Sequence, residues 1–255
     1  MTTAILQAGA TDAIGATWML AYVVIAVASA VLLYYLDAYV RYVLANPDRW
    51  QWAYLAVGVG AGLLYGLAGL AGALTDLGWL DVFAEGASLF FILFLALGIR
   101  EMYFMGPGVD PTARSLPTWV DYLVVAGFVA AWWVGFLFAN PWTHVVVAVG
   151  WVLASAWAIW YAVRTVQRHE GTGVAALTRH LLPAVLCVAG VVLVDLLGEV
   201  GLAPAPVVTA VWVVGTVLVG AFLFNTAVAI RQQGGEVERM YDWTTWRREP
   251  SPLDR

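Results

Sequence analysis

The chain has 255 residues, of which 62% are hydrophobic and only 11% are charged, and its formal net charge is −5. Soluble globular domains carry about 25% charged residues, so this chain lacks the polar side chains that would cover a soluble core. The composition therefore predicts an integral membrane protein in contact with the lipid bilayer, and its acidic balance gives no sign of nucleic-acid binding.

Two chemistries are excluded by residue counts alone. All twelve basic residues are arginine, so no side-chain amine can form a Schiff base with retinal or pyridoxal phosphate. The single cysteine, Cys187, cannot form an intramolecular disulfide or a multi-cysteine metal site. The absence of lysine, together with a pI near 5.1, suggests a GC-rich, salt-adapted genome.

Seven apolar segments follow one another along the chain, each about as long as the hydrocarbon core of a bilayer is thick. The sequence predicts an all-α bundle of seven transmembrane helices. The segments are Thr17–Leu36, Trp52–Ala73, Val82–Ile99, Trp119–Ala139, Val145–Val163, Leu181–Val200 and Pro206–Ile230.

The arginines fall in alternate connections between these segments. Those in the chain before the tail are Arg41, Arg49, Arg100, Arg114, Arg164, Arg168 and Arg179, and the other five lie after the seventh segment. With seven crossings, all twelve face one side, which the positive-inside rule makes cytoplasmic. We therefore expect an outside N-terminus, a transmembrane domain over residues 1–231 and a short cytoplasmic tail over residues 232–255.

The second segment carries Gly58, Gly62 and Gly66 at four-residue spacing. Such a stripe of small residues lets neighbouring helices approach closely in a membrane, so we interpret it as a packing surface. Short connections such as Asn140–Thr143 further predict that sequence neighbours are antiparallel neighbours in space.

Carboxylates collect at the outer ends of the predicted helices, where no arginine is found. They are Asp76, Asp81, Glu85, Asp195 and Glu199, and His144 is the only histidine on that side. Mutual repulsion between such groups recruits protons or cations. One reading is an outward acidic vestibule that binds ions or protons through Glu85, Asp195, Asp81, Glu199 and His144. The other is that Asp76, Asp81 and Glu199 are solvated loop ends and His144 an interfacial hydrogen-bonding group. No recognisable metal-ligand spacing is present.

The inner ends carry residues that we interpret as anchors rather than as sites. Arg100 and Glu101 end the third segment, where we expect snorkelling side chains and cytoplasmic ion pairs. His169 and His180 lie in the basic fifth connection, where we expect contact with headgroups or water.

One face of the seventh segment is ambiguous between packing and binding. Four of its residues share a helical face, namely Thr209, Trp212, Thr216 and Gly220. This face fits core packing or a pocket wall.

The layout of the seven segments and the stretch Phe83-Ala84-Glu85 resemble those of the microbial (haloarchaeal) rhodopsins. This resemblance also suggests an archaeal source. The resemblance implies that Glu85 occupies the counterion position and Glu199 the position of an outer proton-release glutamate. The chain departs from that family where Val219-Gly220-Ala221-Phe222 replaces the retinal-attachment stretch.

These patterns leave two functions open. The first is an opsin-like membrane protein without a covalent chromophore, acting as a sensor, a binding scaffold or a proton- or cation-handling unit. The second is a membrane enzyme that uses carboxylates as acid/base groups on a lipid or carotenoid. Non-covalent retinal or carotenoid, a membrane-protein partner and a homo-oligomer also remain open.

Overall fold

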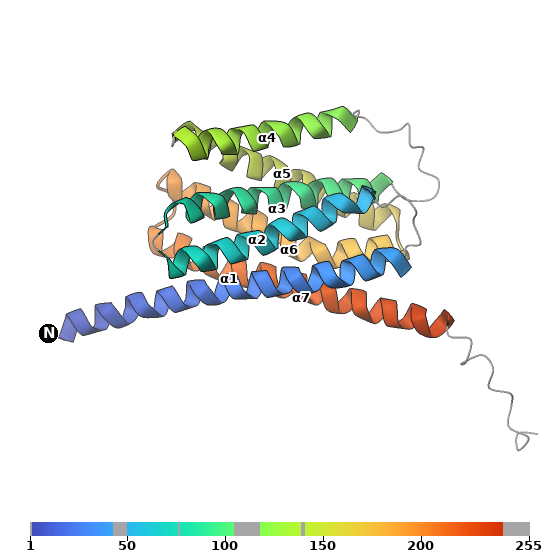
Figure 1. The fold of residues 1–255 in the computed structure, drawn as a ribbon, viewed down its shortest axis with the longest axis horizontal. Coiled ribbons are helices and arrows are strands. Elements are labelled where there is room, and N and C mark those ends of the chain that lie inside the picture. Colours follow the sequence, from blue (N-terminus) through green and yellow to red (C-terminus); the bar gives the residue numbers. More distant parts are fainter. Residues whose placement is uncertain (1, 43–49, 76, 105–117, 139–140, 242–255) are drawn as a thin grey trace, which may run out of the picture.

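The protein is a bundle of seven α-helices in a computed structural model that describes residues 2–42, 50–75, 77–104, 118–138 and 141–241 (Figure 1). The helices are α1 (Thr2–Tyr42), α2 (Trp50–Leu74), α3 (Trp79–Phe104), α4 (Thr118–Phe138), α5 (Pro141–Arg168), α6 (Gly173–Glu199) and α7 (Ala205–Tyr241). The predicted all-α, seven-helix architecture is confirmed. Six of the helices are long and apolar enough to span a bilayer, whereas the described apolar stretch of α4 is shorter, Tyr122–Val134.

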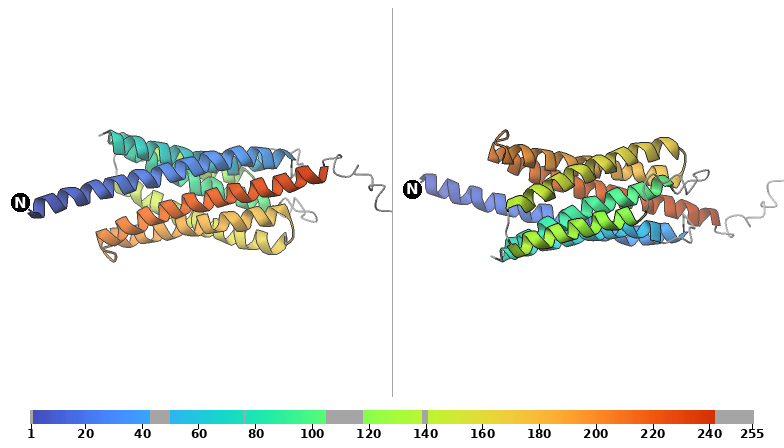
Figure 2. Two further views of the ribbon diagram at one scale, coloured as in Figure 1. Left: turned by 90° about the horizontal axis from the view of Figure 1, so that it is seen from below. Right: turned by 90° about the horizontal axis from the view of Figure 1, so that it is seen from above.

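Six helices close a ring, and the fourth lies outside it. In the ring, α1 packs against α2, α2 against α3, α3 against α5, α5 against α6, α6 against α7, and α7 against α1. Among the described residues, helix α4 makes its main contacts with α3 and α5 and covers their outer flank (Figures 1 and 2). The buried core therefore lies within the six-helix ring, and α3 is the most enclosed of the six spans.

The glycine stripe of α2 is a packing surface, as the sequence predicts. At Gly58, a Cβ atom would lie 2.9 Å from the backbone nitrogen of Leu95 on α3. At Gly66, it would lie 2.8 Å from the backbone nitrogen of Ala26 on α1. Gly58 thus lets α2 approach α3 closely, and Gly66 lets it approach α1, because glycine has no side chain to hold the backbones apart.

Helix α4 is attached to the ring by aromatic side chains that lie over glycines. The Trp132 ring packs directly on Gly86 of α3, and its indole nitrogen donates a hydrogen bond to the backbone oxygen of Val82 at 3.2 Å. Phe128 packs in the same way on Gly150 of α5. These contacts are local, which agrees with the peripheral place of α4.

The helices alternate in direction, so the start of α1 and the end of α7 lie at opposite ends of the bundle (Figure 1). We call the end at which α1, α3, α5 and α7 finish the arginine end, because the helical arginines lie in turns near it. The opposite end is the acidic end, where Glu85 and Asp195 lie.

Three helices extend furthest beyond their predicted apolar segments. Helix α1 begins at Thr2, and α7 continues to Tyr241 although its membrane-length apolar part ends at Gln232. Helix α6 begins at Gly173 rather than at Leu181 and passes through Pro183. The Thr172 side chain caps α6 by accepting a hydrogen bond from the backbone N–H of Ala175 at 3.3 Å.

Candidate functional site

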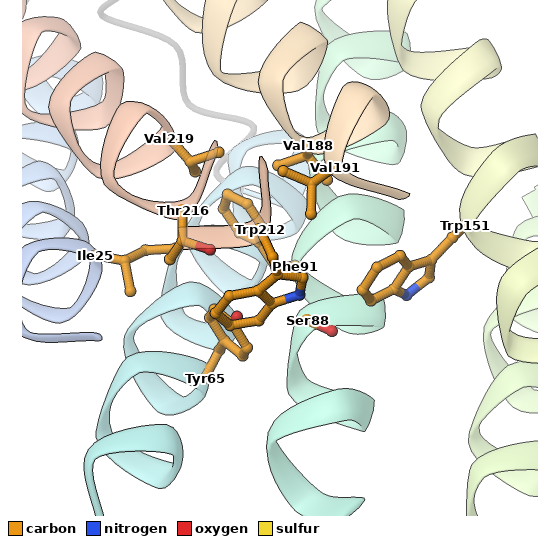
Figure 3. Close-up of a pocket in the computed structure, with 10 residues that line it drawn as sticks. All are labelled: Ile25, Tyr65, Ser88, Phe91, Trp151, Val188, Val191, Trp212, Thr216 and Val219. Carbon is orange, nitrogen blue, oxygen red and sulfur yellow. The ribbon is translucent and has the colours of Figure 1, made fainter. Parts of the chain in front are cut away.

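A small cavity lies at the centre of the ring and is lined by residues of six helices (Figure 3). Its volume is about 40 Å³. The lining residues are Ile25, Tyr65, Ser88, Phe91, Trp151, Val188, Val191, Trp212, Thr216 and Val219. A water molecule needs a cavity volume of about 10–15 Å³, so the cavity has room for two or three waters.

The polar groups around the cavity are few. Tyr65 and Thr216 share a side-chain hydrogen bond between α2 and α7. The Ser88 hydroxyl donates to the backbone oxygen of Glu85 at 2.6 Å. The indole nitrogen of Trp151 is buried with no hydrogen-bond partner among the described residues. Figure 3 shows the Trp151 ring on one side, Trp212 and Tyr65 on the other, and Ser88 between them.

An aromatic cluster lies beside the cavity on its α1 side. Trp18 and Tyr22 of α1 contact Trp212 of α7, with ring centroids 4.3 and 5.7 Å away. Tyr65 of α2 completes the cluster at 5.7 Å from Tyr22 and 6.1 Å from Trp212. Trp18 lies two helical turns nearer the acidic end than the cavity residue Ile25. The cluster therefore extends from the cavity toward that end along α1.

Two of the predicted site residues lie one helical turn from the cavity. Glu85 is half-buried on α3, three residues before Ser88, and Asp195 is half-buried on α6, four residues after Val191. Residues three or four apart share a helix face. Both carboxylates thus follow a cavity-lining face outward, toward the acidic end.

The other predicted site residues cannot be placed in the same way. Asp81, Glu199 and His144 lie in α3, α6 and α5, but their side chains are outside the described part of the chain. Asp76 is outside the described residues altogether.

The ambiguous face of α7 has both roles. Trp212 and Thr216 line the cavity, so the pocket-wall interpretation is confirmed for these two residues. Gly220 packs against α1, where a Cβ atom would lie 3.1 Å from the backbone nitrogen of Ile25.

The interpretation of Arg100 and Glu101 as exposed anchors is wrong. Their side chains are 1% and 4% exposed, because α2, α5 and α6 enclose the last turns of α3. The Arg100 guanidinium carbon lies 5.9 Å from the ring centroids of both Phe104 and Trp157. The apolar run resumes after this charged pair as Met102-Tyr103-Phe104, a signal that the helix stays in the core past the charges.

His169 lies in the turn between α5 and α6, as the sequence predicts, but the expected contact with headgroups or water is wrong. It is 6% exposed, and its Nε2 atom lies 3.0 Å from the backbone oxygen of Tyr103. The reason is that α5 and α6 nearly meet, leaving only a short turn, so His169 is held against the end of α3.

The cavity is small for a binding site, because drug-sized ligands occupy pockets of about 300–1,000 Å³, whereas this cavity measures about 40 Å³. Among the described residues, no three His, Cys, Asp or Glu side chains are grouped to hold a metal ion.

This fold and this interior define an integral, multi-pass membrane protein with a small, mostly apolar central cavity. No family model, no curated protein and no solved structure matches the chain.

Proposed function

We propose that this protein is a non-enzymatic membrane sensor or binding unit that handles protons or small cations at its acidic end, through Glu85 and Asp195. One observation carries the proposal: both carboxylates lie one helical turn outward from the central cavity, on faces that line it. Ionisable residues within membrane spans are costly and mark ion or proton pathways by default.

The hydrogen bond from Ser88 supports a coupling between Glu85 and the cavity. Ser88 lines the cavity and donates to the backbone of Glu85 at 2.6 Å. A change in the charge of Glu85 that moves this turn of α3 also moves a cavity wall. Small local shifts of this kind in a packed bundle are amplified into larger conformational changes in molecular switches.

The resemblance to microbial rhodopsins supports the same assignment of Glu85, on layout and on the Phe83-Ala84-Glu85 stretch. Gly220 stands where that family would place its retinal lysine, and it packs against α1. Any opsin-like activity of this chain therefore proceeds without a covalent chromophore. We propose the outer Glu199 and Asp81 as further members of the acidic group, with His144 beside them.

Glutamine at position 85 is expected to remove most of the proton response. Glu85→Gln keeps the side-chain shape but cannot ionise. We expect proton uptake by vesicles that contain the protein and a trapped pH dye to fall toward that of empty vesicles, and Asp195→Asn to have a smaller effect of the same sign. The matched control is Asp37→Asn, an exposed carboxylate near the arginine end. Equal uptake by Glu85→Gln and the parent protein would remove this role.

The membrane orientation can be measured with two single-cysteine variants. We propose that the arginine end is cytoplasmic. In a Cys187→Ser background, an impermeant maleimide is expected to label Leu202→Cys on intact cells, and Glu170→Cys only after permeabilisation. Both positions are exposed in turns at opposite ends of the bundle. The reverse pattern would invert the proposed orientation.

The enzymatic alternative requires a lipid-accessible cavity that joins two carboxylates. The residues that line the described cavity include no carboxylate, which favours the first proposal.

A further inference from the structure

The last turns of α5 carry two arginines four residues apart, Arg164 and Arg168, and each is held by an aromatic ring. The Arg164 guanidinium carbon lies 4.8 Å from the Trp160 ring centroid. That of Arg168 lies 5.0 Å from the Tyr103 ring centroid, and its Nη1 atom donates to the Tyr103 hydroxyl at 3.0 Å. Cation–π contacts of this kind restrict the directions in which the guanidinium groups point.

Neither arginine is neutralised by a carboxylate within the described part of the chain. The neighbouring Arg179, by contrast, forms a salt bridge with Glu170 at 3.5 Å. Side chains four residues apart on a helix lie about 5–6 Å from each other at Cβ, and like charges at this spacing repel. An anion that contacts both guanidinium groups would remove this repulsion.

The position of the two arginines points to a lipid rather than to a soluble anion. They end a stripe of exposed apolar side chains on α5 that includes Leu153 and Trp160, each 60% exposed. The candidate membrane span of α5, Val149–Arg168, finishes at the same place. An exposed tryptophan at the end of a span is typical of the headgroup zone, so the guanidinium groups lie at the depth of lipid phosphates.

We infer that Arg164 and Arg168 form a binding site for the phosphate group of an anionic lipid, with the Trp160 ring against the same lipid. The planar guanidinium fork matches phosphate oxygens in a bidentate geometry. Tyr103 is a positioning residue, because it orients Arg168 through its ring and its hydroxyl. This site lies on the lipid-facing surface of the arginine end and does not depend on the carboxylates of the proposed function.

The double variant Arg164→Gln/Arg168→Gln tests the site. The full chain is placed in phosphatidylcholine vesicles that contain spin-labelled phosphatidylglycerol or spin-labelled phosphatidylcholine, and the motionally restricted fraction gives the relative affinity. A basic residue at a membrane surface changes the binding of anionic lipid about fivefold. We expect the double variant to lose about fivefold or more of the preference for phosphatidylglycerol, leaving little selectivity.

Two further variants separate this site from a general effect of charge. Arg179→Gln is the matched control, and its preference should equal that of the parent protein because Arg179 is already paired with Glu170. Tyr103→Phe keeps every charge and should lose part of the preference. An unchanged preference in the double variant, or an equal loss in Arg179→Gln, would overturn the inference. So would inorganic phosphate that binds the detergent-purified parent protein but not the double variant, because the ligand would then be free phosphate.

Discussion

The Arg100→Gln variant is expected to lose about 3–5 kcal/mol of unfolding free energy, the range for breaking a buried charge interaction by removing one member. Arg100 is almost fully buried and lies between the rings of Phe104 and Trp157. Glutamine keeps a polar group but removes the buried charge that lies beside these two rings.

This loss can be measured by denaturant titration in uncharged micelles, followed by circular dichroism. The matched control is Arg231→Gln, an exposed arginine on α7, which should change the free energy by less than about 1 kcal/mol. If Arg100→Gln is no less stable than Arg231→Gln, the charge at position 100 does not stabilise the bundle.

The Gly66→Ala variant is expected to lose about 1–3 kcal/mol of unfolding free energy, the usual cost of overpacking. The added Cβ would lie 2.8 Å from the backbone nitrogen of Ala26 and 2.8 Å from the backbone oxygen of Tyr22. Backbone atoms of α1 cannot rotate away as a flexible side chain could. The two helices must separate instead, which weakens the contact between α1 and α2.

Gly60→Ala is the matched control for this substitution on the same helix. No atom lies within 4 Å of the position where its Cβ would be. Alanine there should raise the unfolding free energy by about 0.5–1 kcal/mol, because glycine is unfavourable inside a helix. The same denaturant titration compares the two variants. Equal effects at positions 60 and 66 would show that the α1–α2 contact does not depend on the glycine.

The number and order of the helices could be predicted from the sequence because lipid imposes a length on each apolar segment. The positions of the helix ends could not be predicted in this way, because the backbone hydrogen bonds of a helix continue past the hydrocarbon boundary. Helix α1 therefore begins fifteen residues before the predicted Thr17, and α6 eight residues before the predicted Leu181. The hydropathy of the sequence therefore indicates the length of the membrane-embedded part of each helix, but not where the helix itself begins and ends.

The candidate site could be predicted only where one helix supplies the residues. The spacing of Trp212 and Thr216 places both on one face of α7, and both line the cavity. Tyr65, Ser88 and Trp151 join them from α2, α3 and α5, and nothing in their local sequence indicates this meeting. The charge pattern of the sequence also failed to predict the burial of Arg100, since a position near a helix end does not reveal whether neighbouring helices cover it.

The two longest helices, α1 and α7, have a mechanical consequence. At 1.5 Å per residue they measure about 60 and 55 Å, roughly twice the hydrocarbon thickness of a bilayer. They pack side by side, and each projects from a different end of the bundle (Figures 1 and 2). Because the two helices pack along each other, a tilt of the projecting part of α1 at the acidic end would displace α7, whose projecting part lies at the arginine end.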